Sequence, residues 1–236
     1  MRFIILLIIF PLLSLWTVFW SLGVVLFFPF PHIGHGIERI WSWGWCAALG
    51  IRVTIINPEK LHSHPGMILA PNHQSMFDIL VCSRLPVDFR YLSKKEVKYI
   101  PVLGWALSTL KTYWVSRDRS GRDLEVMKRV EAGLRDGHSV MIYPEGTRTR
   151  TGELLPFKKG AFITAINANA PICPIAISGT FNIAPPGQLP KKRGFDVTIR
   201  VGDSLTLDPN LPVSAHMEAL RTRMERLLLL NANNMV

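Results

Sequence analysis

The first 37 residues of the chain carry almost no charge. From Phe3 to Ile37 there is no Asp, Glu, Lys or Arg, and residues 3–28 are almost wholly aliphatic or aromatic. A helix of 26 residues extends about 39 Å at 1.5 Å per residue, and the hydrocarbon core of a bilayer is about 30 Å thick. Such a helix has no polar face to present to water. We therefore predict that residues 1–50 form an N-terminal hydrophobic helical membrane anchor.

The sequence leaves two geometries open for this anchor. One helix is long enough to span the bilayer with some tilt, but Pro11 and Gly23 interrupt the run, so two short helices embedded in one leaflet are a competing geometry. A cleavable signal peptide fits poorly, because residues 28–31 (FPFP) are not a small-residue cleavage site. Trp41, Trp43 and Trp45 alternate along a second apolar patch, and indole rings suit the level of the lipid headgroups.

Charge indicates the side of the membrane and the kind of partner. The chain has 27 Lys and Arg against 17 Asp and Glu, a net charge of +10, and only Arg2 precedes the apolar run. The positive-inside rule therefore predicts that the domain after residue 50 lies on the cytoplasmic face, at the inner membrane if the source is bacterial. A basic protein suits anionic lipids and substrates. Nucleic acid is not expected as a partner, because the basic residues are scattered and have no stacking aromatics beside them.

Residues 51–236 alternate short β-rich runs with helical ones, which predicts an α/β domain with a mixed or mostly parallel sheet flanked by helices. The expected strands are 52–56, 67–70, 88–92, 113–115, 140–143, 172–177 and 196–201, and the expected helices are 75–83, 122–135, 160–168 and 213–230. The last helix has an apolar face that includes Leu220 and Met224. This face either closes the core of the domain or lies on a membrane surface, and we favour the first.

The first group of chemically capable residues is Asn72-His73-Gln74-Ser75-Met76-Phe77-Asp78, directly after an apolar strand. Histidine accepts a proton near neutral pH, and a carboxylate bonded to its other ring nitrogen fixes the tautomer. Positions five apart on one helix are separated by about 140°, so His73 must lie in the turn before the helix and Asp78 in its first turn. The alternative is that Ser75 and Asp78 form a helix cap without any catalytic role.

The second group is Tyr143-Pro144-Glu145-Gly146-Thr147-Arg148, again at the end of an apolar strand, where α/β folds hold their ligands. The guanidinium of Arg148 is planar and suits phosphate, and Gly146 lets the backbone approach a ligand closely. The alternative is a plain turn with a surface ion pair.

Together the two groups resemble the glycerolipid acyltransferase family, and most of all bacterial 1-acyl-sn-glycerol-3-phosphate acyltransferases (lysophosphatidic acid acyltransferases). That family is recognised by NHxxxxD, an intervening arginine motif, FPEGTR and a later apolar stretch with proline. Here the arginine motif matches residues 114–119 (WVSRDR), and the last stretch matches 172–177 (ICPIAI). Residues 157–160 (FKKG) resemble a further basic turn of the family. Tyr143 replaces the usual Phe, and Ser116 stands where Asp is common.

The resemblance implies a reaction and a set of site residues. An acyl chain would pass from acyl-CoA or acyl-acyl-carrier protein to lysophosphatidic acid, giving phosphatidic acid, with neither metal nor cofactor. His73 would be the general base and Asp78 its orienting partner, and the N–H of Gly146 would be an oxyanion donor. The substrate-binding residues would be Glu145, Gly146, Thr147, Arg148, Arg117, Arg119 and Lys158.

Other functions remain open on the sequence. The acceptor could be glycerol-3-phosphate or another lysolipid, the same base could serve a membrane-anchored acyl thioesterase, or the fold could bind lipid without catalysis. His62 and His64 form a His-x-His pair, but Pro65 and Gly66 follow directly, so we expect solvated loop residues rather than metal ligands. The three cysteines are widely spaced and are expected to be reduced core residues.

Overall fold

The computed structural model describes residues 4–28, 30–116, 122–190 and 192–233. Its centre is a seven-stranded sheet in the order β1-β7-β6-β2-β5-β3-β4, in which every neighbouring pair is parallel except β6–β7. The strands are β1 (Ile51–Ile56), β2 (Ile68–Pro71), β3 (Arg90–Lys94), β4 (Tyr113–Val115), β5 (Val140–Met141), β6 (Ile172–Ser178) and β7 (Phe195–Val201). The predicted mixed, mostly parallel sheet is therefore confirmed.

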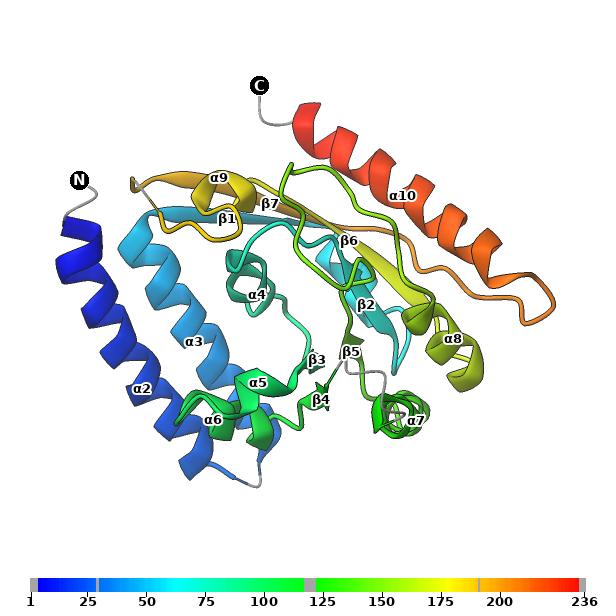
Figure 1. Cartoon of the computed structure of the whole chain (residues 1–236), viewed down its shortest axis with the longest axis horizontal. Helices are drawn as coiled ribbons and strands as arrows, with labels where there is room; N and C mark the ends of the chain where they lie inside the picture. Colours follow the sequence, from blue (N-terminus) through cyan, green and yellow to red (C-terminus); the bar gives the residue numbers. More distant parts are fainter. Residues whose placement is uncertain (1–3, 29, 117–121, 191, 234–236) are drawn as a thin grey trace.

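Helices cover both faces of this sheet (Figure 1). They are η1 (Ile5–Ile9), α2 (Phe10–Leu26), α3 (Pro31–Leu49), η2 (Pro58–His62), α4 (Phe77–Cys82), α5 (Lys95–Lys98), α6 (Leu103–Thr109), α7 (Arg122–Arg135), α8 (Lys159–Ala168), α9 (Thr180–Ile183) and α10 (Val213–Asn233). The four helices expected in the α/β domain are present as α4, α7, α8 and α10. The short helices α5, α6 and α9 were not predicted, because they have too few turns to show a periodicity.

The strands divide their side chains between two cores. Leu69 and Ile175 pack in the core on the side of α3 and α4, whereas their neighbours Ala70 and Ala176 pack in the core on the side of α7, α8 and α10. This alternation follows from the period of two along a strand. Leu220 and Met224 of α10 are fully buried in the second core, so this helix closes the domain, as predicted.

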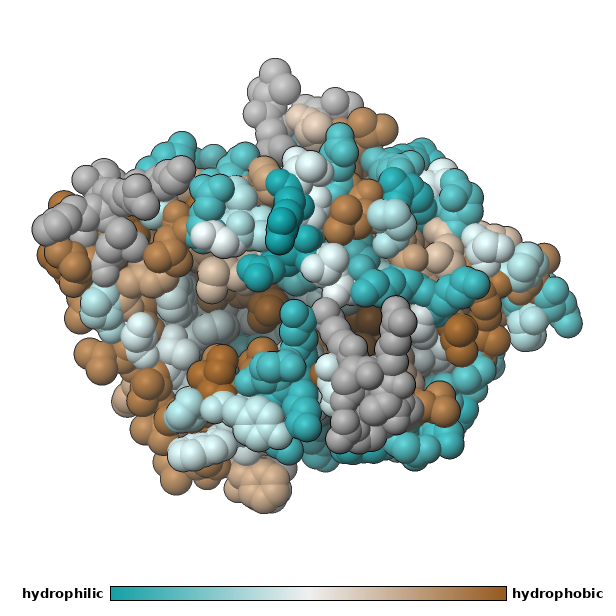
Figure 2. All heavy atoms as spheres, viewed as in Figure 1, coloured by the Kyte–Doolittle hydropathy of each residue, from teal (hydrophilic) through white to brown (hydrophobic). Residues whose placement is uncertain are grey.

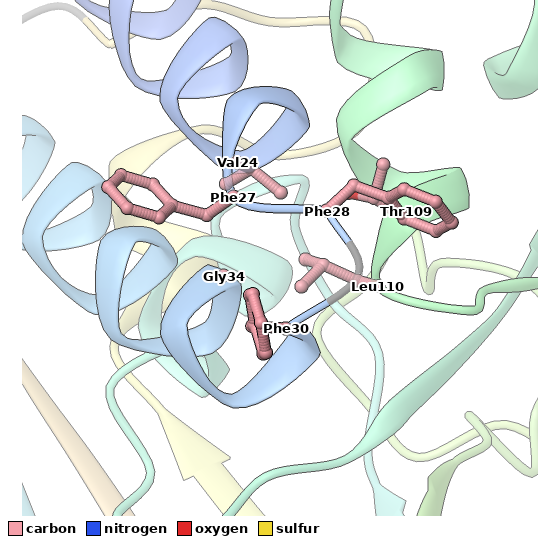
Figure 3. A pocket seen from close by; sticks show the side chains of 7 residues that line it. All are labelled: Val24, Phe27, Phe28, Phe30, Gly34, Thr109 and Leu110. Atoms are coloured by element: carbon pink, nitrogen blue, oxygen red, sulfur yellow. The ribbon is translucent and has the colours of Figure 1, made fainter.

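The N-terminal residues form a hairpin of two long helices. The helical backbone runs from Ile5 through Pro11 and Gly23 to the end of α2 at Leu26, and α3 begins at Pro31. The interruption expected at Pro11 and Gly23 is therefore wrong, because both residues lie within α2. Phe27, Phe28 and Phe30 surround a small hollow beside the end of α6 (Figure 3).

Polar contacts between indoles and a hydroxyl hold α2 and α3 together. The indole N–H groups of Trp41 and Trp45 both donate to Thr17 Oγ1 at 3.0 Å, and the indole of Trp16 donates to the carbonyl of Trp41. The Trp16 ring lies so close to Gly44 that a Cβ there would overlap it. Trp41 and Trp45 thus bond within the hairpin rather than to headgroups, while Trp43 is 57% exposed.

The outer side of this hairpin is apolar and uncovered. Five large apolar side chains of α2 are between 49% and 79% exposed: Leu12, Leu15, Phe19, Leu22 and Leu26. Figure 2 shows brown side chains along the same side of the molecule. Among the described residues, one helix, Leu7–Leu26, is long and apolar enough to cross a membrane. The helix α3 ends at Leu49 and β1 begins at Ile51, at the predicted boundary. The division into residues 1–50 as anchor and 51–236 as acyltransferase domain stays a prediction.

A buried carboxylate joins the hairpin to the sheet. Glu38 of α3 is 8% exposed, and its Oε1 accepts hydrogen bonds from the hydroxyls of Tyr91 (2.6 Å) and Ser83 (2.8 Å). Its Oε2 lies 3.2 Å from Nδ1 of His35. Burial and the charge of Glu38 raise the pKa of Tyr91, which therefore stays a donor. Because Ser83 ends α4, this contact sets the position of that helix against α3.

We predict that Glu38→Ala destabilises the fold, because it leaves two buried hydroxyls without their acceptor. The free energy of unfolding should fall by about 2–4 kcal/mol, lowering Tm in detergent by several degrees. Glu59→Ala, which removes an exposed carboxylate, is the matched control. Equal Tm values for the two variants would contradict the structural role of Glu38.

Candidate active site

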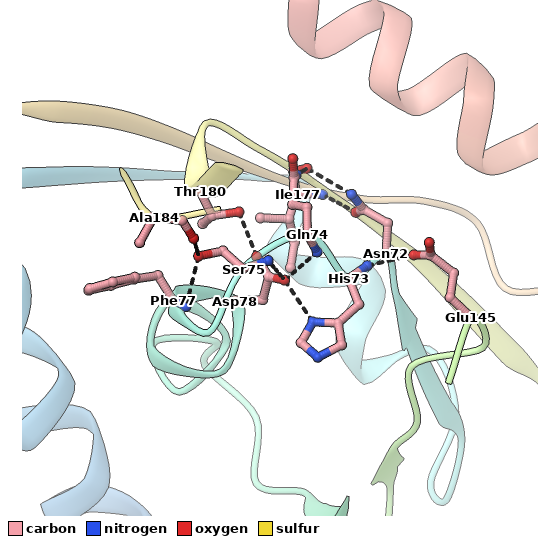
Figure 4. A network of polar contacts seen from close by, with 10 residues as sticks. All are labelled: Asn72, His73, Gln74, Ser75, Phe77, Asp78, Glu145, Ile177, Thr180 and Ala184. Carbon is pink, nitrogen blue, oxygen red and sulfur yellow. Dashed lines mark hydrogen bonds and ion pairs between the residues drawn. The ribbon is translucent and has the colours of Figure 1, made fainter. Parts of the chain in front are cut away.

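His73 lies in the turn between β2 and α4, where the predicted general base was expected. Its Nδ1 is 2.7 Å from Oδ2 of Asp78, which lies in the first turn of α4 (Figure 4). The Asp78 side chain is fully buried, and the His73 side chain is 15% exposed. The turn lets the histidine bend back over the helix, so residues five apart in sequence come into contact.

The carboxylate of Asp78 has further partners. Its Oδ2 also accepts the backbone N–H groups of Gln74 (2.7 Å) and Ser75 (2.8 Å), and its Oδ1 accepts the hydroxyl of Thr180 at 2.5 Å. The bond from the N–H of Ser75 is one of the two hydrogen bonds of a capping box, the helix cap that is the alternative role for Ser75 and Asp78. Asp78 therefore bonds the turn before α4 and the imidazole at the same time. The helix itself begins at Phe77 rather than at residue 75.

This arrangement fixes the chemistry of the imidazole. A carboxylate accepts hydrogen bonds, so in the neutral ring this contact places the proton on Nδ1 and the lone pair on Nε2. The ring stacks on Tyr143, with centroids 4.0 Å apart and an angle of 27° between the planes. Within the part of the chain that the structure describes, Nε2 makes no hydrogen bond. It is thus positioned to accept a proton from a bound molecule.

The second motif follows β5 and contacts the backbone of the first. The N–H of His73 donates to Oε1 of Glu145 at 2.6 Å, and the carbonyl of His73 accepts the N–H of Thr149 at 2.9 Å. The other carboxylate oxygen of Glu145 accepts the N–H of Leu155 at 2.8 Å. Glu145 is 2% exposed, and burial raises its pKa to about 7, against the opposing effect of its two N–H donors.

Gly146 stands at a position that needs glycine. Its φ is +68°, which favours glycine, and a Cβ there would come within 3 Å of the end of the Lys158 side chain. Its N–H donates to the carbonyl of Tyr143 at 3.0 Å within the turn. That N–H is already used, so the expectation that it serves as an oxyanion donor is not supported.

The remaining predicted residues of this motif face outward. Thr147, Arg148 and Lys158 are all exposed, and the Lys158 side chain lies over the Gly146 turn. Arg117 and Arg119 lie outside the described residues. The structure therefore brings the histidine, the PEGT turn and two cations to one edge of the sheet, at the carboxyl ends of β2 and β5.

Other reactive side chains near the site are either hydrogen-bonded or buried. The hydroxyl of Ser75 donates to the carbonyl of Ala184 at 2.7 Å, and burial strongly raises the pKa of the Cys82 thiol. All three cysteines are buried and free, as expected. His62 and His64 are exposed, and no group of three metal-ligating side chains is found among the described residues.

Sequence reasoning missed Thr180. This residue begins α9 just after β6 and is fully buried, and Figure 4 shows its hydroxyl directed at Asp78. Its position follows the apolar stretch 172–177 through Ser178 and Gly179. That strand end was a signal in the sequence, because strand ends of a parallel sheet gather at one edge, but the partner of the hydroxyl was not predictable.

We predict that Thr180→Val lowers the free energy of unfolding by about 1–3 kcal/mol, because it leaves Oδ1 of Asp78 buried without a donor. Thr180→Ser keeps the hydroxyl and should cost only about 1 kcal/mol for the lost methyl group. Denaturant unfolding of the two variants in detergent distinguishes them. A larger loss for Thr180→Ser would show that packing, and not the hydrogen bond, determines the effect.

Comparison with known proteins shows the family of this chain. The family model described as Acyltransferase matches residues 52–178, which include both motifs. A protein of Saccharomyces cerevisiae named 1-acyl-sn-glycerol-3-phosphate acyltransferase is 36% identical over 58% of this chain and 46% of its own length. A putative 1-acyl-sn-glycerol-3-phosphate acyltransferase of Caenorhabditis elegans is 30% identical over 85% of this chain and 83% of its own. The chain thus spans about half the length of the yeast relative.

The fold is also known from a crystal structure. The 1-acyl-sn-glycerophosphate (LPA) acyltransferase PlsC from Thermotoga maritima matches with a TM-score of 0.76 over 92% of this chain and 94% of its own, at 19% sequence identity. The likeness extends over the N-terminal hairpin as well as the sheet, since it covers nearly the whole chain. The family predicted from the two sequence motifs is confirmed, and this chain belongs to the acyltransferase family.

Proposed function

We propose that the protein transfers an acyl chain from an acyl thioester to the sn-2 hydroxyl of 1-acyl-sn-glycerol-3-phosphate, giving phosphatidic acid. The observation that carries this proposal is the buried Asp78–His73 pair, which leaves the lone pair of Nε2 available on the same sheet edge as the exposed Arg148 and Lys158. Relatives named 1-acyl-sn-glycerol-3-phosphate acyltransferase support the choice of acceptor. The thioester would be acyl-CoA or acyl-acyl-carrier protein.

The reaction needs one proton acceptor and no nucleophile from the protein. Nε2 of His73 takes the proton of the acceptor hydroxyl as the oxygen attacks the thioester carbonyl. Asp78 stabilises the imidazolium that forms, because its carboxylate is buried 2.7 Å from Nδ1. When the tetrahedral intermediate collapses, the C–S bond breaks, and the imidazolium returns its proton to the leaving thiolate.

A covalent acyl-enzyme is not part of this proposal. The Ser75 hydroxyl is buried and donates to a backbone carbonyl, and the Cys82 thiol is fully buried with a raised pKa, so it is a poor nucleophile. The hydroxyl of the acceptor is thus the attacking group.

The phosphate of the acceptor would bind the outward-facing part of the second motif. Arg148 provides a planar donor fork, and Lys158 provides a mobile point charge beside the Gly146 turn. Thr147 adds a hydroxyl on the same exposed segment. Arg117 and Arg119, which lie outside the described residues, are proposed for the same role on the family likeness.

An apolar cavity of about 170 Å³ lies among residues of α2, α3, α4, β3, α5 and α6. It is smaller than the roughly 300–1,000 Å³ of most ligand pockets, so it would hold only part of a fatty chain of a substrate. Ile79, which follows Asp78 in α4, forms part of the wall, whereas His73 does not. Because both N-terminal helices contribute, a chain could enter this cavity from the bilayer.

The membrane supplies the setting for this reaction. We propose that the exposed apolar side of the α2–α3 hairpin binds the bilayer, where the acyl chains of the substrates are dissolved, and that the domain faces the cytoplasm. The charge bias after the apolar run supports this side.

His73→Ala should lower the rate of acyl transfer by about 10²- to 10⁴-fold, because the proton acceptor is lost. The measurement is phosphatidic acid formed by the detergent-solubilised protein from labelled acyl-CoA and lysophosphatidic acid. Glycerol-3-phosphate, lysophosphatidylglycerol and no acceptor are tested in parallel. His62→Ala changes an exposed histidine at the end of η2; it is the control and should retain activity.

The outcomes of this assay separate the candidate functions. Transfer to another acceptor would keep the mechanism but change the substrate, whereas free fatty acid formed without an acceptor would indicate a thioesterase. Full activity of His73→Ala would remove the histidine as the base. If acyl-CoA gives no product, the same assay with acyl-acyl-carrier protein tests the other donor.

Arg148→Ala should raise the KM for lysophosphatidic acid about tenfold or more, since a hydrogen bond between charged groups contributes about 1.5–3 kcal/mol. Monoacylglycerol, which lacks the phosphate, should be affected little. Arg129→Ala removes an exposed cation on α7 and is the matched control. An equal loss with the phosphate-free acceptor would exclude phosphate recognition by Arg148.

A further inference from the structure

The carboxylate of Glu145 is directed into the protein, opposite to the cations that follow it. Glu145 is 2% exposed, whereas Thr147 and Arg148 are exposed. Both of its oxygens accept backbone N–H groups, from His73 at 2.6 Å and from Leu155 at 2.8 Å. With 2% of the residue exposed, a substrate hydroxyl has no open path to these oxygens. The residue therefore does not have the exposure that a substrate ligand needs.

The same carboxylate holds one side of His73. The N–H of His73 donates to Glu145, and the carbonyl of His73 accepts the N–H of Thr149 at 2.9 Å. The N–H and the carbonyl of His73 are thus both bonded to residues 145–149, within and directly after the second motif. The imidazole is bonded separately to Asp78. With the backbone and Nδ1 both fixed, the direction of Nε2 is determined.

The second oxygen of Glu145 bonds the far end of the loop that carries Arg148. The loop leaves the PEGT turn at Thr147 and returns at Leu155, whose N–H donates to Oε2. The carbonyls of Leu154 and Leu155 accept the guanidinium of Arg221 from α10, at 3.3 and 3.2 Å. Glu145 therefore contacts both the turn of His73 and the returning end of this loop.

We propose that Glu145 is a positioning residue, which holds the His73 turn and the 147–155 loop in register, and that it does not contact the substrate. This inference rests on the proposed function for its kinetic test. It differs from the role that the family resemblance implies for this glutamate, which is substrate binding.

The kinetic test compares Glu145→Gln with Glu153→Gln, which changes an exposed glutamate in the same loop. The amide introduced by Glu145→Gln can accept only one of the two N–H groups and presents its own donors to the other. We expect kcat to fall about 10- to 100-fold, with the KM for lysophosphatidic acid within about twofold. The loss should be the same with monoacylglycerol. A raised KM with kcat unchanged would overturn the proposal.

A second measurement does not depend on the reaction. In histidine-labelled protein, the His73 ring signals, assigned by comparison with His73→Ala, should shift in Glu145→Gln and stay unchanged in Glu153→Gln. Unchanged ring signals in Glu145→Gln would overturn the positioning role, whatever the activity. If the proposed function fails, so that no acceptor is acylated, this comparison still tests the role of Glu145.

A third measurement uses the unmodified protein, and therefore holds even if Glu145→Gln does not fold. The backbone N–H of His73 should exchange slowly with deuterium, because its acceptor is a buried carboxylate. The amide should stay equally protected when lysophosphatidic acid is added in micelles. Rapid exchange, or protection lost when the lipid is added, would show that Glu145 turns to the substrate.

Discussion

The hydrogen bond between His73 and Asp78 is the contact on which the site depends. Asp78 is fully buried, and a charge without partners there would cost several kcal/mol. The structure supplies those partners from the two backbone N–H groups before α4 and from Thr180 after β6. The carboxylate thus has all its partners within the protein, and its contact with Nδ1 of His73 leaves the lone pair of Nε2 in the neutral ring available to accept a proton.

The sheet brings the parts of this site together from distant positions in the sequence. β2 lies between β5 and β6, and all three are parallel, so their carboxyl ends lie at one edge. His73 follows β2, Glu145 follows β5 and Thr180 follows β6. The N-terminal hairpin is attached to the same structure, because Glu38 of α3 bonds Ser83 at the end of α4. The helix that carries Asp78 is thereby held between the sheet and the hairpin.

Much of the fold and of the site could be predicted, and the failures have physical causes. The strands were predictable because each buries apolar side chains, and the spacing of His73 and Asp78 required a turn before a helix. The strand predicted at residues 140–143 ends at Met141, and Tyr143 beyond it stacks on His73, a contact that the sequence pattern does not show. Trp41 and Trp45 were expected at headgroups, but a hydroxyl on a different helix accepts their N–H groups.

The sequence by itself determined the apolar N-terminus, the alternation of strands and helices, and the motifs that identify the acyltransferase family. These are local properties, since charge, periodicity and spacing are readable along the chain. Only the tertiary structure decided which groups are buried and which partners they have. It directed Glu145 inward to two N–H groups, used the N–H of Gly146 within its own turn, and placed Thr180 against Asp78. The last of these contacts joins residues 102 positions apart. No local pattern specifies such a contact, because it depends on the order of the strands in the sheet.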